Sequence, residues 1–156
     1  MAKRKRIVWD DSATAAASAR LKLPPLVQSY FEQGRKLAQG NASPPALHLF
    51  RLKTKRLRYT LEIFRSCYGP GLETRLAALR KVQDCLGEVS DCAAARQLTA
   101  AILPPRSPER KAIEHFLLGR TEWRAAQFRR HWQKVFDVPG EHRRWRNYLA
   151  RPASLA

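Results

Sequence analysis

The chain has 156 residues, of which 44% are hydrophobic and 28% charged. That length suggests one domain with a proper core, and the composition excludes an intrinsically disordered chain. Thirty Lys and Arg residues against thirteen Asp and Glu give a formal net charge of +17. Such an excess indicates a polyanionic partner, whether nucleic acid, anionic lipid or polyphosphate, without saying which.

The three cysteines, Cys67, Cys85 and Cys92, stand among apolar residues. An odd count without a closely spaced pair is a poor basis for a disulfide framework or a zinc site. We therefore expect reduced core thiols and a cytoplasmic protein. No apolar run is long enough to span a membrane, and the segment after the basic N-terminus lacks the apolar core of a signal peptide.

Hydrophobic residues recur at helical spacing along the chain, and no segment alternates as a β-strand does, so we expect an all-α fold. Residues 1–20 combine a KRKR run with an Ala/Ser-rich stretch, and we expect them to form a mobile tail. Pro24 and Pro25 are expected to open the first helix, which ends near Gln39, because proline is tolerated in a first turn. Gly34 in its middle predicts a close crossing with another helix.

Connectors rich in proline and glycine separate the remaining helices. A second helix is predicted over residues 44–67, with Ser43 as its N-cap. A third helix begins near Leu72, is broken or sharply bent at Gly87, and is followed by a fourth over about residues 90–103.

The C-terminal part is predicted to hold a long last helix over residues 108–136 and then a basic tail over residues 141–156. Short connectors favour antiparallel neighbours. We therefore expect residues 21–140 to form one antiparallel helical bundle with a long C-terminal helix.

The stretch 47–65 has both a core-forming face and a cationic face. At about 100° per residue, one arc of this helix holds the apolar residues Leu47, Phe50, Leu57, Leu61 and Phe64. A second arc holds His48, Arg51, Lys55, Arg58, Tyr59 and Glu62. Cations three or four residues apart repel by roughly 0.2–0.5 kcal/mol per pair, a cost that an anion along the row would offset. An ordinary structural histidine beside a solvated basic face is the alternative interpretation.

A second motif lies downstream and reads Leu79-Arg80-Lys81-Val82-Gln83-Asp84-Cys85-Leu86-Gly87, followed by Asp91. Together with His48-Leu49-Phe50-Arg51, Lys55-Arg56-Leu57-Arg58-Tyr59 and Tyr68-Gly69-Pro70, it resembles the CHAD family, the conserved histidine α-helical domain. Val82 stands where leucine is commoner. The matching motifs cover about residues 47–91.

The resemblance implies a helical bundle that binds inorganic polyphosphate through a basic surface, without catalysis, and that associates with polyphosphate granules. Members often carry two repeats, each with its own histidine motif. This chain has room for one and contains no second H-x-x-R-x-x-x-[KR]-R pattern. We therefore expect a homodimer that rebuilds the two-repeat arrangement, and a single repeat acting alone is the alternative.

The candidate polyphosphate-binding residues lie on the basic row of the second helix and on neighbouring helices. Helical steps of three and four residues place donors about 5–6 Å apart, close to the spacing of linked phosphates. Arginine offers a planar pair of donors and lysine a point charge, while a nearby phosphate favours the charged form of histidine. The set is His48, Arg51, Lys55 and Arg58, with Arg56 at the rim, and with Arg35, Arg80, Arg120, Arg124 and His131 as an extension.

Two other classes of function remain open. The aromatic residues Tyr30, Phe31, Trp123 and Trp132 could stack on single-stranded nucleic acid, but their helical spacing favours core packing. Asp84 and Asp91 could act with His48 on a phosphate ester, although capping or orienting roles are commoner. The chain has no Gly-rich phosphate loop, no HExxH motif and no ExxH pair, so we expect neither a metal nor a cofactor.

Overall fold

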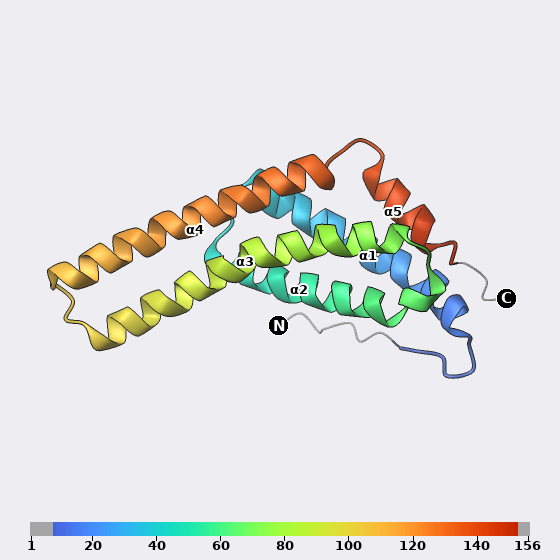
Figure 1. Ribbon diagram of the computed structural model, residues 1–156, viewed down its shortest axis with the longest axis horizontal. Coiled ribbons are helices and arrows are strands. Elements are labelled where there is room, and N and C mark those ends of the chain that lie inside the picture. The colour runs from blue at the N-terminus through green and yellow to red at the C-terminus, as the bar shows by residue number, and fades with distance from the viewer. Residues whose placement is uncertain (1–7, 153–156) are drawn as a thin grey trace.

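The computed structural model describes residues 8–152, which contain five α-helices, one short 3-10 helix and no strand (Figure 1). The all-α prediction is therefore confirmed for this part of the chain. The elements are α1 (Ala15–Gln39), α2 (Pro44–Ile63), the 3-10 helix η1 (Arg65–Cys67), α3 (Gly71–Ile102), α4 (Pro108–Val135) and α5 (Glu141–Leu149).

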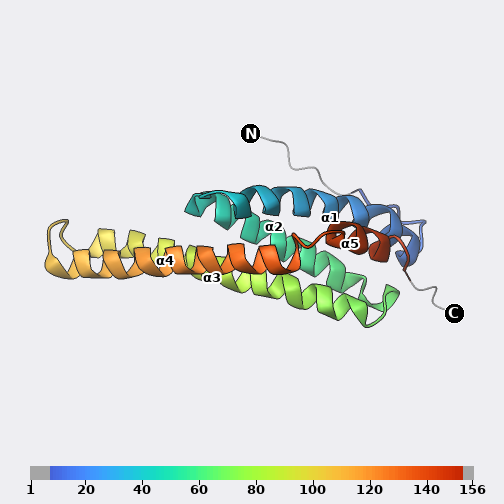
Figure 2. The ribbon, with the colours of Figure 1, turned by 90° about the horizontal axis from the view of Figure 1, so that it is seen from above.

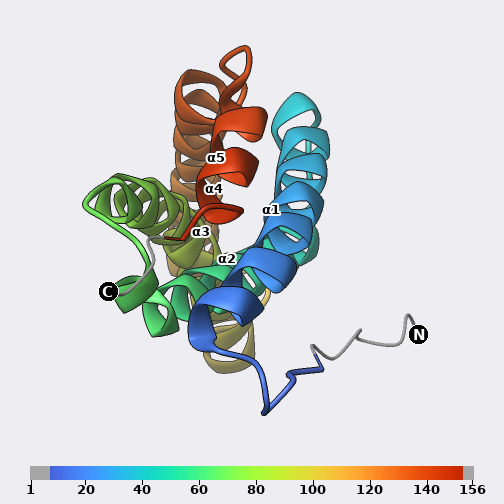
Figure 3. The same cartoon turned by 90° about the vertical axis from the view of Figure 1, so that its right-hand side faces the viewer.

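The first four α-helices form an antiparallel bundle in which α2 packs against α1 and α3, and α4 packs against α3 and α1. The short helix α5 returns along α1 (Figure 3). Helices α3 and α4 continue well beyond the ends of α1 and α2 as a two-helix projection (Figures 1 and 2). Among the helices described, none is long and apolar enough to cross a membrane.

The core is rich in aromatic side chains contributed by α1, α2, α4 and α5. Its largest fully buried members are Trp132, Trp145, Tyr30, Phe31, Phe128 and Phe136. The rings of Trp132 and Phe136 stack with centroids 4.4 Å apart, and those of Tyr30 and Phe50 stack at 4.8 Å. The whole predicted apolar arc of α2 is buried. Among the aromatics considered for stacking on bases, Tyr30, Phe31 and Trp132 belong to this core, whereas Trp123 is exposed.

The predicted start of the first helix is wrong. Pro24 and Pro25 lie inside α1, which begins at Ala15, so the predicted tail of residues 1–20 overlaps the helix. Two prolines remove two backbone donors. The helix continues because its first turns pack against the bundle, with Ala19 fully buried. The KRKR run lies outside the described residues.

The predicted break at Gly87 is also wrong, because α3 is a single helix of 32 residues. Glycine inside a helix costs about 1 kcal/mol relative to alanine. Leu86 and Val89, on either side of Gly87, are fully buried, and their packing outweighs that cost.

Two smaller differences concern helix ends. Helix α2 stops at Ile63, and residues 65–67 form η1 instead of a last α-helical turn. The predicted basic C-terminal tail contains α5, whose Trp145 and Leu149 are buried. These apolar residues anchor a segment whose other side chains are largely charged.

The predicted close crossing at Gly34 is confirmed, because a Cβ atom there would overlap the indole ring of Trp132. We expect Gly34→Ala to lower the free energy of unfolding by about 1–3 kcal/mol, the usual range for overpacking a core. Gly119→Ala is the matched control, since nothing lies within 4 Å of a Cβ atom built there. It should raise stability by roughly 0.5–1 kcal/mol through helix propensity. Urea denaturation of both variants checks this, and equal effects would contradict the crossing.

Candidate functional site

His48 on α2 faces Ser90 on α3. The Nδ1 atom of His48 lies 3.0 Å from Ser90 Oγ, and this hydroxyl donates to the carbonyl of Leu86 at 3.2 Å. A hydroxyl has one proton, so Ser90 Oγ accepts from His48 Nδ1–H. This contact fixes the ring on the α2–α3 seam and leaves Nε2 without a partner among the described residues.

Arg51 lies one helical turn further along α2 and packs over Gly87 of α3. A Cβ atom at Gly87 would be 3.6 Å from Arg51 Nε, so a side chain larger than alanine would press on the guanidinium. Arg51 Nε is buried and has no hydrogen-bond partner within residues 8–152. An unpaired buried donor costs about 1–3 kcal/mol, which an oxyanion could relieve.

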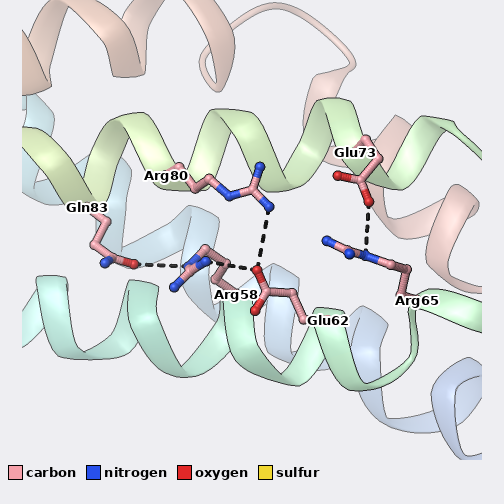
Figure 4. Close-up of polar contacts among 6 residues, drawn as sticks. All are labelled: Arg58, Glu62, Arg65, Glu73, Arg80 and Gln83. Carbon is pink, nitrogen blue, oxygen red and sulfur yellow. Dashed lines mark hydrogen bonds and ion pairs between the residues drawn. The ribbon is translucent and has the colours of Figure 1, made fainter.

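Arg58 is held from two sides on the same seam (Figure 4). Its Nε atom donates to Gln83 Oε1 of α3 at 3.1 Å, and its Nη1 atom donates to Glu62 Oε1 at 2.8 Å. Arg80 of α3 approaches the same carboxylate oxygen at 3.6 Å. Glu62 therefore neutralises one of two neighbouring arginines and fixes the position of both.

Lys55 lies between Arg51 and Arg58 on the row. It is half-buried, its Nζ atom lies 6.0 Å from the Tyr59 ring centroid, and it forms no ion pair in the described part of the chain. The row therefore has two kinds of cation. Arg58 is committed to protein partners, whereas Arg51 and Lys55 have no carboxylate partner.

Arg120 and Arg124 of α4 share a single carboxylate on α3. Arg120 Nη2 lies 2.7 Å from Glu88 Oε2, Arg124 pairs with the other oxygen, and both guanidinium groups lie over the Trp123 ring. The hydrogen bond from Arg124, followed by that from Arg120, lowers the pKa of Glu88. Because Gly87 and Glu88 are consecutive, Arg51 from α2 and Arg124 from α4 approach adjacent positions of α3.

The remaining candidates lie apart from the row. Arg35 pairs with Asp137 at 3.0 Å, and Arg56 lines a groove between α1 and α2. His131 lies in the α3–α4 seam, where its Nε2 atom is 3.0 Å from the carbonyl oxygen of Ala78 and so donates to it. Burial lowers the pKa of His131, which makes it a weak contributor of positive charge near neutral pH.

Ser90 and Glu88 contact candidate site residues, and the sequence reasoning included neither of them in the site. Both stand just after the Leu86-Gly87 end of the downstream motif, which is the only signal that could have drawn attention to them. Asp84 and Asp91 are exposed, and neither is joined to His48 by a hydrogen bond in the described structure. Residues 8–152 contain no cluster of three His, Cys, Asp or Glu side chains that could hold a metal ion.

The CHAD domain family model matches residues 3–100, which is more than half of the chain. The match covers α1, α2 and nearly all of α3, including the His48 row and the seam that faces it. The chain belongs to the CHAD domain family. No curated protein and no solved structure matches it significantly.

His131 provides a test of the α3–α4 seam through pH. Since the folded state lowers its pKa from 6.5, the unfolded chain binds more protons as pH falls, and stability decreases below about pH 6.5. His131→Gln, whose amide can still donate to Ala78, should flatten this decrease between pH 7.5 and 5 in urea denaturation. His115→Gln, at an exposed position, should leave the pH dependence as in the wild type. An unchanged slope in His131→Gln would contradict the burial of this ring.

Proposed function

We propose that this protein binds inorganic polyphosphate along the α2–α3 seam, as a non-catalytic module associated with polyphosphate granules. The observation that carries the proposal is the pairing pattern of the row. His48, Arg51 and Lys55 keep unused donors on one helix face, while Arg58 and Arg80 border them with a shared carboxylate. The membership of the CHAD domain family supports the same ligand.

The geometry suits a flexible, regularly charged chain without bases. Donors one turn apart on α2 repeat at about 5–6 Å, and each can reach a different phosphate unit. Arginine can take two oxygens of one unit. Arg51 and Lys55 are half-buried. Salt therefore screens their attraction to an anion less than it would at a fully exposed position.

Nucleic acid is the weaker candidate, because single strands are bound on exposed aromatic rings. Tyr59 and Trp123 are exposed, but arginine side chains cover their rings, with Arg58 4.5 Å and Arg120 4.8 Å from the centroids. Trp132 and Trp145 lie in the core, Trp9 packs against Phe64, and Phe116 is exposed on α4, outside the α2–α3 seam. The seam therefore offers little for base stacking.

Substitutions in the row should weaken polyphosphate binding without unfolding the bundle. A hydrogen bond to a charged group contributes about 1.5–3 kcal/mol, and 1.4 kcal/mol is about tenfold in affinity. We therefore expect Arg51→Ala and Lys55→Ala each to weaken binding about tenfold. Fluorescence anisotropy with labelled long-chain polyphosphate at fixed salt measures this, with circular dichroism to check folding.

Arg56→Ala is the matched control, because it removes the same charge from the same helix on a face away from the row. It should change affinity less than about threefold if the loss of one charge acts only through long-range attraction. Excess RNA should displace little of the labelled polyphosphate. The proposal would be contradicted if RNA easily displaced the polyphosphate, or if Arg51→Ala and Arg56→Ala lost the same affinity for it.

The absence of catalysis is tested separately. Polyphosphate incubated overnight with the protein and Mg²⁺ or Mn²⁺ should keep its length on a gel and release no orthophosphate. The control is the same incubation without protein. Chain shortening that disappears in His48→Ala would instead show an enzyme that hydrolyses phosphoanhydride bonds.

A further inference from the structure

The α3–α4 hairpin projects from the bundle without a core of its own. Cys92 on α3 and Ala125 on α4 are buried, and none of the residues 93–124 between them is. We call residues 93–124 the arm. It extends past α1 and α2 in two perpendicular views (Figures 1 and 2). Among the described elements, the two helices of the arm therefore cover only each other.

The arm carries large apolar side chains on its surface. Ile102 and Phe116 are each 68% exposed. The exposed apolar set of the arm is Leu98, Ile102, Ile113, Phe116, Leu118 and Trp123. Leu98 and Ile102 are four residues apart on one face of α3, and Ile113 and Phe116 are three residues apart on one face of α4. Exposed apolar pairs of this kind on a polar protein indicate an interaction surface.

The arm has six basic and three acidic residues, and Glu88 and Asp91 lie directly before it on α3. With these two, the segment from Glu88 to Arg124 has six basic and five acidic residues, whereas α2 alone has five basic residues and one acidic residue. Ion pairs inside this segment join Arg110 to Glu114, and Arg120 and Arg124 to Glu88. Two copies of a chain with a net charge of +17 repel each other, and they repel least where their charges are already paired.

We propose that the arm is a self-association surface, on which the arm of a second copy packs to form a four-helix assembly. Two antiparallel hairpins that each bury an apolar face form such a bundle. The arm has 32 residues, so two arms must pack along their whole length to approach the roughly 20–30 residues a side of a standard interface. A polyanion is a poor occupant because the cations of the arm that form no ion pair in the described structure, Arg96, Arg106 and Lys111, lie on α3, on the connector and on α4 and do not form a row along one helix. The proposal is independent of which anion binds the α2–α3 seam.

Light scattering of the full chain tests the proposal, with Ile102→Glu/Phe116→Glu as the arm variant. The matched control is Ile63→Glu, because Ile63 and Ile102 are both exposed and each is the last residue of its helix. Measurements in about 0.5 M salt, where charge–charge interactions are screened, remove dimers bridged by a bound polyanion. Circular dichroism measures the helical content of each variant. If the glutamates reduce it, Ile102→Ser/Phe116→Ser replaces the first arm variant.

The wild type and Ile63→Glu should both show twice the chain mass in high salt, and the arm variant should show the mass of one chain. Screening the repulsion between the basic bundles should tighten the wild-type dimer. A wild type that stays monomeric at about 100 µM would overturn the proposal. So would a dimer that dissociates in high salt, or one that survives in the arm variant.

Discussion

Two glutamates, Glu62 and Glu88, organise the cationic side of this molecule. Carboxylates are scarce, with thirteen acidic residues for thirty basic ones. Each of these two is shared by two arginines, Arg58 with Arg80 and Arg120 with Arg124. Sharing fixes four guanidinium groups while leaving a net positive charge at each site. The cations between them, Arg51 and Lys55, have no such partner in the described chain, so the distribution of acids determines which donors remain for a ligand.

A basic row can keep this geometry because the opposite face of α2 is fixed in the core. Trp132 of α4 meets aromatic rings of both α1 and α2, among them Tyr30 and Phe50. Gly34 allows that approach, since any side chain there would occupy the space of the indole. The apolar contacts of this core offset the mutual repulsion of the charges above it. The packing of the apolar face of α2 in the core therefore sets the spacing of the donors, and this spacing does not depend on a bound anion.

The division of α2 into an apolar arc and a basic arc could be predicted, because helical periodicity is a local property of the sequence. The predictions that failed relied on single residues as helix breakers. Pro24, Pro25 and Gly87 all lie inside helices, since the burial of neighbouring residues outweighs the local cost. The contacts of His48 and Arg124 could not be predicted, because they depend on how α2 and α4 are aligned along α3. Nothing in the periodicity of a single helix specifies that alignment.

The arm follows from unequal helix lengths. Helices α3 and α4 have 32 and 28 residues, against 25 in α1 and 20 in α2. Extending an existing helix adds one hydrogen bond per residue and needs no new nucleus, so the bundle can support helical turns that have no core. Ser107 caps the returning helix, since its hydroxyl accepts from the backbone N–H of Arg110 at 3.2 Å. The extended helices thus separate the proposed anion site, whose donors on α2 have no carboxylate partner in the described structure, from the proposed association surface on the arm.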